Sequence, residues 1–183
     1  MKTKIIYFVH GTTCDNASGM CSGWKQVELN DLGKEQAKKL GELTKDLHFD
    51  VLFTSDLVRA IVSADLAWPE CEKIQDERLR ECDYGDFTGK REDQVVYEDY
   101  IDKPFPNGES LLDVEKRIAD FIEFIKQEYA GKTIAIVAHR APQLALEVLT
   151  KGLTWEEALR NDWRKRKAWQ PGWEYEVNDE IKS

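Results

Sequence analysis

The sequence has few of the features that mark specialised protein classes. It contains four cysteines in 183 residues and no CxxC pair, so the ligand spacing of a structural zinc site is absent. Its apolar runs are far shorter than the roughly 20 residues that a membrane-spanning helix needs. The formal net charge of −9 lacks the basic excess typical of a general nucleic-acid binder. We therefore expect neither a zinc module, nor a membrane protein, nor a nucleic-acid partner.

We also expect no secretory leader. Met1–Lys4 lead directly into an apolar run that is too short for the core of a signal peptide. We therefore expect a cytoplasmic protein, whose cysteines stay reduced, although Cys14–Cys21 and Cys71–Cys82 are conceivable disulfides. The acidic balance does not exclude an anionic substrate, because a few arginines can set the potential of one cleft.

What the sequence does have is a pair of histidines at the ends of apolar runs. The apolar run 5–9 is followed directly by His10, and the apolar run 133–138 is followed directly by His139. Short apolar runs bounded by turn residues are typical of buried parallel strands, whose carboxyl ends are where open α/β sheets bind ligands. We expect the two imidazoles to share one site. The third histidine, His48, has no such company and is predicted to be a surface residue.

Strand and helix patterns alternate along the whole chain. This alternation predicts an α/β fold, a three-layer α/β/α sandwich around a mostly parallel mixed sheet, in a single domain over residues 1–183. The run 173–177 alternates apolar and polar residues as an edge strand does. The predicted strands are 5–9, 51–54, one near Ile74, 133–138 and 173–177, and the predicted helices are 31–47 capped by Asn30 or Asp31, one capped by Ser55 or Asp56 and ending near Leu66, 91–101, 109–129, 142–149 and 155–161.

Five segments stand in the order of a known family's motifs. They are Phe8–Thr13 with Asn16, Phe53–Ala60, Leu79–Lys90, Pro106–Ser110 and Val137–His139. Together they resemble the histidine phosphatase, or phosphoglycerate mutase-like, superfamily over residues 4–150. One such motif would be weak, but five in the same order make the resemblance specific.

The resemblance implies a covalent mechanism and a role for each matched residue. His10 is expected to attack phosphorus and to carry the phosphoryl group, and His139 to stabilise charge on that group. Glu81 is expected to protonate the leaving oxygen and later to take a proton from water. Arg59, a planar donor fork, and Asn16 are expected to bind phosphate. The resemblance implies no cofactor and no metal.

One position departs from the family pattern. The residue before the nucleophilic histidine is normally arginine, and here it is Val9. Losing such a charge-assisted contact costs a few kcal/mol, or roughly 10²-fold in rate. Arg140 stands where the family usually has glycine, so we name it as a phosphate-binding residue that replaces the lost cation. Lys90 is a weaker substitute, and a solvent-facing Arg140 is the open alternative.

A basic run near the carboxyl end lies beyond the family motifs. It comprises Arg160 and Arg164–Lys167, with Trp163 and Trp169 nearby. Such a run is either a solvated face or an attraction for an anionic substrate tail or polyanionic partner. The sequence does not decide between these readings.

The activity expected from these residues is hydrolysis of a small phosphomonoester. The cover between Gly89 and the long helix is short, which favours a phosphatase over a mutase, because a mutase must exclude water. Mutase activity stays open, as does a weakly active relative that binds phosphorylated ligands, which Val9 would suit. A dinucleotide-binding protein is disfavoured because no GxGxxG follows the first strand. Residues 11–30, including Met20 and Trp24, and 91–107 are expected to set specificity, in a monomer or a homodimer.

Overall fold

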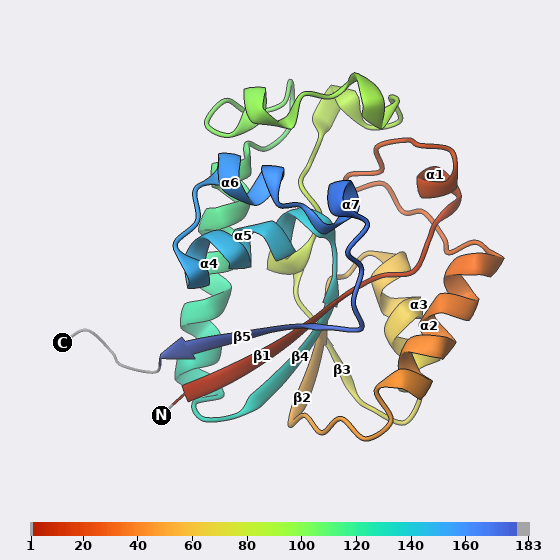
Figure 1. The fold of residues 1–183 in the computed structure, drawn as a ribbon, viewed down its shortest axis with the longest axis vertical. Coiled ribbons are helices and arrows are strands. Elements are labelled where there is room, and N and C mark those ends of the chain that lie inside the picture. Colours follow the sequence, from red (N-terminus) through yellow and green to blue (C-terminus); the bar gives the residue numbers. More distant parts are fainter. Residues whose placement is uncertain (1, 179–183) are drawn as a thin grey trace.

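The computed structural model describes residues 2–178 and has one five-stranded sheet at its centre (Figure 1). The strand order is β3-β2-β4-β1-β5, in which all neighbours are parallel except β1 and β5. The mixed, mostly parallel sheet confirms the predicted fold class. Residues 1 and 179–183 of the predicted domain lie outside the described residues. The strands are β1 (Lys2–Val9), β2 (Val51–Thr54), β3 (Lys73–Gln75), β4 (Thr133–Ala138) and β5 (Trp173–Asn178).

Helices cover both faces of the sheet, which gives the three layers. In Figure 1, α2 and α3 lie on one side of the sheet, and α4, α5 and α6 lie on the other. The central strand β4 serves both cores: Ile134 and Ile136 face one, and Ala135 and Val137 face the other. A strand buried on both faces reads as a continuous apolar run, which is why this strand is evident in the sequence. The helices are α1 (Cys14–Ala17), α2 (Asp31–Leu43), α3 (Val58–Ala67), α4 (Leu111–Glu128), α5 (Arg140–Lys151), α6 (Trp155–Arg160) and α7 (Trp163–Arg166).

Two predictions about helices are wrong. Helix α3 begins at Val58 after Leu57, and neither Ser55 nor Asp56 caps it. Both side chains have other partners: the Ser55 hydroxyl lies 2.6 Å from a ring nitrogen of His139, and Asp56 pairs with Arg80. The polar residues before this helix therefore hold the site rather than the helix end.

The predicted helix at 91–101 is also absent. The structure has two short 3-10 turns instead, η3 (Glu92–Gln94) and η4 (Tyr97–Tyr100). They are separated by Val95 and Val96, β-branched residues with extended backbone angles. This segment forms a thin cover above the carboxyl ends of the strands (Figure 1).

Other boundaries shift by a few residues. Helix α5 begins at Arg140 rather than Pro142, because a proline is tolerated within the first turn of a helix, where its missing N–H is not needed. Helix α2 has the expected cap, since the Asn30 side chain accepts from the Gly33 N–H at 2.8 Å, but it ends at Leu43 rather than Leu47. The edge strand β5 alternates between buried and exposed residues as predicted.

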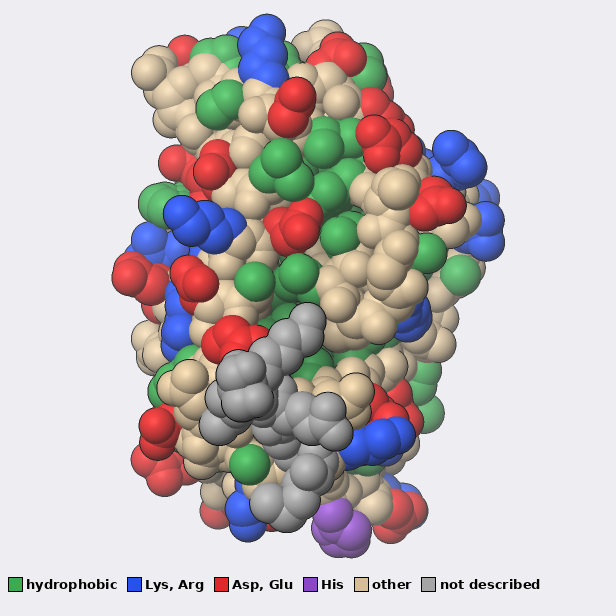
Figure 2. Space-filling model, turned by 90° about the vertical axis from the view of Figure 1, so that its left-hand side faces the viewer, with side chains coloured by type: hydrophobic (Ala, Val, Ile, Leu, Met, Phe, Trp, Pro, Cys, Tyr) green, Lys and Arg blue, Asp and Glu red, His purple; other side chains and the backbone are tan. Residues whose placement is uncertain are grey.

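The surface and the thiols agree with an ordinary globular chain. On the face drawn in Figure 2, acidic and basic side chains are interspersed among apolar and polar ones. The four cysteines are free thiols, and His48 is exposed. Among residues 2–178, no helix combines the length and the hydropathy that crossing a bilayer requires.

Candidate active site

His10 stands at the carboxyl end of β1 with its ring held in one orientation. Its backbone N–H donates to the Ala138 carbonyl at 3.1 Å, which extends the ladder between β1 and β4. Its Nδ1 lies 2.7 Å from the Gly11 carbonyl oxygen. A carbonyl only accepts, so Nδ1 carries the hydrogen and Nε2 keeps a lone pair. Burial, and then the charge of Arg59, lowers the pKa of His10 to about 3. His10 is therefore a neutral imidazole at ordinary pH.

His139 meets His10 at the end of the neighbouring strand. The two ring centroids are 5.0 Å apart. The backbone of His139 is fixed by the Tyr7 hydroxyl, which accepts from its N–H at 2.9 Å and donates to its carbonyl at 2.6 Å. Its Nε2 is bonded to Ser55, and its buried Nδ1 has no partner among the described residues. Burial holds the pKa of His139 well below its usual value. The pair confirms that the two strand ends deliver both imidazoles to one place.

Arg59 is a buried cation whose charge acts on His10, and it is only 1% exposed. Helix α3 delivers it, and its guanidinium donates to the carbonyls of Lys25 and Gly23 at 2.9 and 2.7 Å. The loop that follows α1 therefore fixes the orientation of this cation. Asn16 lies nearby, and its side-chain oxygen accepts from the Thr13 N–H and hydroxyl. Its amide N–H groups are left for a ligand.

Glu81 lies at the same edge of the sheet, and only one of its two carboxyl oxygens accepts backbone hydrogen bonds. Its Oε1 accepts from the backbone N–H groups of Cys82 at 2.9 Å and Ala141 at 3.0 Å. The second N–H belongs to the first turn of α5, so the carboxylate is tied to the helix that follows His139. Since both bonds go to Oε1, Oε2 is the oxygen on which a proton can be carried.

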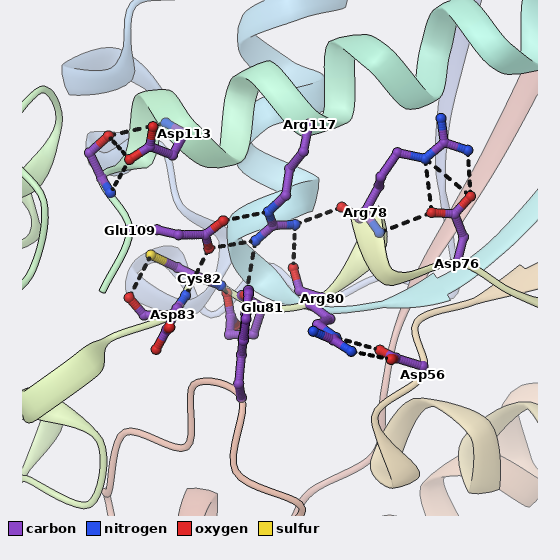
Figure 3. Close-up of polar contacts among 12 residues, drawn as sticks. Asp56, Asp76, Arg78, Arg80, Glu81, Cys82, Asp83, Glu109, Asp113 and Arg117 are labelled. Atoms are coloured by element: carbon purple, nitrogen blue, oxygen red, sulfur yellow. Dashed lines mark hydrogen bonds and ion pairs between the residues drawn. The ribbon is translucent and has the colours of Figure 1, made fainter. Parts of the chain in front are cut away.

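Arg117 on α4 is a site residue that the motifs do not predict (Figure 3). Its guanidinium donates to the carbonyls of Arg78, Arg80 and Glu81 at 2.6–2.9 Å. It also pairs with Glu109, whose other contact is the Asp83 N–H. This network clamps the backbone on both sides of Glu81. The signal in the sequence is the position of Arg117, three residues after Val114. It lies beside the buried face of α4, where a charged side chain needs partners.

Two cavities meet at His10. The outer cavity, of about 510 Å³, includes Val9, Thr12 and Arg140 in its walls. The inner cavity is much smaller and is lined by Arg59, Met20 and Tyr84 among others. His139 is fully buried and lines neither cavity, and its ring packs against that of His10.

Arg140 reaches the outer cavity, but its charge is already paired. Its Nε donates to Asp162 at 2.5 Å in a pair that is almost fully buried, and its guanidinium lies 4.3 Å from the Tyr97 ring centre. Lys90 lies over the Phe87 ring instead and lines neither cavity. The solvent-facing alternative for Arg140 is therefore wrong, although its role toward phosphate stays a prediction.

The remaining wall of the outer cavity comes from the basic run. Trp163, Arg164, Lys167 and Trp169 all line it. The run is therefore not simply a solvated face. Asp162, which precedes it, has the residue type of a helix N-cap and accepts from the Arg164 N–H at 2.9 Å. That capping signal is present in the sequence, but the placement of the run beside His10 is not.

The two specificity segments also border the site. Met20 lines the inner cavity, and Glu92 lines both cavities. Trp24 acts differently: its indole N–H donates to the Glu81 carbonyl at 2.7 Å, so it supports the backbone of that residue. Among residues 2–178, no group of three or more His, Cys, Asp or Glu side chains is arranged to hold a metal ion.

Comparisons with known proteins agree with this fold. A 2,3-bisphosphoglycerate-dependent phosphoglycerate mutase of Chelativorans sp. (strain BNC1) is 32% identical over 179 residues, 87% of each chain. A phosphoserine phosphatase from Entamoeba histolytica shares the fold with a TM-score of 0.77 and 23% identity over 86% of this chain and 84% of that one. A phosphoglycerate mutase from Bacillus anthracis str. Sterne has a TM-score of 0.75 and 24% identity over 82% and 81%.

The family itself follows from the match of a family model to most of the chain. The family model described as histidine phosphatase superfamily (branch 1) matches residues 6–164, which span the site from β1 to Arg164. The chain belongs to the histidine phosphatase superfamily.

Proposed function

We propose that this chain is a phosphatase that hydrolyses a small phosphomonoester through a phosphohistidine at His10, without a metal or a cofactor. One observation carries the proposal. The Gly11 carbonyl holds the hydrogen on Nδ1, and the low pKa of the ring keeps it neutral, so the Nε2 lone pair is free to attack phosphorus.

In the first step, Nε2 of His10 forms a bond to phosphorus while the ester P–O bond breaks. Glu81 gives the proton on Oε2 to the leaving oxygen, and the alcohol departs. Arg59 and Asn16 bind the phosphoryl oxygens. The unpartnered Nδ1 of His139 is the donor that we assign to charge developing beside His10.

In the second step, the Glu81 carboxylate takes a proton from a water molecule, whose oxygen attacks phosphorus. The P–N bond breaks, and inorganic phosphate and neutral His10 are released. Glu81 thus returns to its starting state. The two backbone bonds to Oε1 keep Oε2 in place for both proton transfers.

A mutase is the second candidate, because the relative named above that is 32% identical is a 2,3-bisphosphoglycerate-dependent phosphoglycerate mutase. The two activities share the phosphohistidine and differ in what accepts the phosphoryl group, water or a second hydroxyl. The cover made by η3 and η4 is thin, which favours water as the acceptor. A ligand-binding relative without turnover needs neither a free Nε2 on His10 nor a carboxyl oxygen of Glu81 left without backbone bonds, so we place it third.

We further propose a cytoplasmic enzyme whose partner is a small phosphorylated substrate, acting as a monomer or homodimer without nucleic-acid or membrane partners. The test is hydrolysis of para-nitrophenyl phosphate in EDTA between pH 5 and 8. His10→Ala should abolish it, and His48→Ala, which removes an exposed histidine far from these contacts, should not. A parallel assay with 3-phosphoglycerate and a trace of 2,3-bisphosphoglycerate separates the two candidates: transfer without release of phosphate would establish a mutase.

A further inference from the structure

The surroundings of His10 offer few positive charges to a phosphoryl group. Both imidazoles are neutral, and the side chain of Glu81 adds no positive charge at the same edge of the sheet. Arg59 is the fully buried cation that lines the inner cavity together with His10. A phosphomonoester arrives as a dianion, and the charge on its equatorial oxygens must be stabilised during transfer. Val9, the residue before the nucleophile, carries no charge, so a second cation has to come from another element.

Arg164 occupies the position from which such a cation can act. The inner and outer cavities share five lining residues, which are His10, Asn16, Glu81, Glu92 and Arg164. Arg164 is the cation among these five. Its charge also contributes to the low pKa of His10, which places its field on the nucleophile.

Asp162 sets the positions of two arginines at once. Its Oδ1 accepts from the backbone N–H of Arg164, and its Oδ2 accepts from the Nε of Arg140. The carboxylate is 1% exposed, so it cannot easily exchange Arg140 for solvent or ligand. The charge of Arg140 is thus balanced inside the protein, whereas that of Arg164 is not balanced by Asp162.

The guanidinium of Arg164 has a partner that a ligand can displace. It is paired with Glu92, and its side chain is 34% exposed. An exposed ion pair contributes little free energy, so exchanging a carboxylate for a phosphoryl oxygen is cheap. Glu92 also accepts from the Tyr97 hydroxyl at 3.1 Å, so it keeps a partner after the exchange.

We propose that Arg164, delivered by the short helix α7, is the second phosphoryl-binding cation of this site, and that Glu92 positions it until the phosphoryl group takes over one of its donors. The inference rests on the proposed function for the chemistry at His10. It assigns to the basic run a contact with the reacting group itself, rather than with a remote part of the substrate.

The test is the binding of inorganic phosphate to the full chain, measured by titration calorimetry. Arg164→Ala should weaken phosphate binding about 10-fold or more, because a charge-assisted contact is lost. The matched control is Lys165→Ala. Lys165 lies on the same helix, pairs with Glu98 at 3.5 Å and lines neither cavity at His10, so phosphate binding should change less than about twofold. Arg164→Lys should lie between, since it keeps the charge but not the planar fork.

A second variant tests whether an arginine at position 9 can replace Arg164. Val9 lines the outer cavity, so Val9→Arg in the Arg164→Ala background should restore phosphate binding and turnover. Circular dichroism of each variant shows whether it is folded. Equal phosphate binding by folded Arg164→Ala and Lys165→Ala variants would overturn the inference.

The same titrations separate this inference from the proposed function. Phosphate binding that depends on Arg164, without any phosphohistidine at His10, would remove the function and leave the cation assignment. Phosphohistidine formation at His10 that is unchanged in Arg164→Ala would leave the proposed function and remove the cation assignment. Absence of phosphate binding by the wild type would contradict both.

Discussion

The inner and outer halves of the site are built in different ways. The inner half places His10 at a strand end and Arg59 in the first turn of a helix, and backbone carbonyls hold both. The outer half places Arg164 on a four-residue helix, where its side-chain pair with Glu92 of the cover segment holds it. Backbone partners are fixed by the fold, whereas side-chain pairs exchange. On the proposed function, the rigid half holds the nucleophile, and the adjustable half supplies the second cation for the phosphoryl group.

The largest effect is expected in the rigid half. His10→Ala should lower turnover by about 10³-fold or more, since the nucleophile is lost and no other group replaces Nε2. Steady-state hydrolysis of para-nitrophenyl phosphate measures it, with His48→Ala as the control. Retention of wild-type turnover by His10→Ala would remove the basis for the distinction between the halves.

The proton donor is expected to show a dependence on the leaving group. Glu81→Gln should reduce hydrolysis of an alkyl phosphate by about 10²- to 10⁴-fold, because an alkoxide needs a proton to depart. The effect on para-nitrophenyl phosphate should be much smaller, since nitrophenolate leaves unaided. A comparison of kcat for the two substrates measures this. Equal losses on both would assign Glu81 a binding role instead.

The buried ion pair between Asp162 and Arg140 should contribute to the stability of the protein. Asp162→Ala leaves the buried guanidinium of Arg140 without its partner, and we expect a loss of about 3–5 kcal/mol in the free energy of unfolding. Urea denaturation followed by tryptophan fluorescence measures it. Asp93→Ala, which removes the partner of an exposed arginine on the cover segment, is the control and should have little effect. Similar midpoints for both variants would show that the buried pair does not hold the outer wall in place.

The smallest effect is a slope in the pH dependence of stability. The folded pKa of His10 is lowered to about 3 and that of His139 is also lowered, so between that value and about 6.5 the unfolded chain binds more protons than the folded one. Stability should therefore fall as the pH falls through this window, by up to about 1.4 kcal/mol per pH unit for each imidazole. Urea titrations at several pH values, with His10→Asn as comparison, measure the share of His10. An identical slope in the variant would mean that His10 is not buried as a neutral ring.

The sequence predicts the inner half much better than the outer one. The convergence of His10 and His139 follows from two apolar strands that pair side by side, with Val9 opposite Ala138 in register. That inference needs only local patterns and the rule for parallel sheets. The family resemblance then names Arg59 and Glu81, and the structure places Arg59 in the inner cavity and Glu81 in both cavities.

The outer half escapes prediction because its contacts join distant segments. Arg164 meets Glu92 across more than seventy positions of sequence, and the pairing depends on how α7 packs over the strand ends. The cap of α3 fails for a related reason. Ser55 and Asp56 have the residue types of an N-cap, but tertiary partners, His139 and Arg80, take both side chains. At Ser55 and Asp56, these tertiary partners outweigh the local preference for an N-cap.

The most direct test of the central claim is to trap the phosphoenzyme. Wild-type protein would be mixed with a phosphodonor, quenched in base and digested, and the phosphopeptides sequenced by mass spectrometry. The account predicts an acid-labile, base-stable phosphate on His10, which is present in His48→Ala and absent in His10→Ala. Rapid hydrolysis of the donor with no phosphate on His10, or with phosphate on another residue, would contradict it.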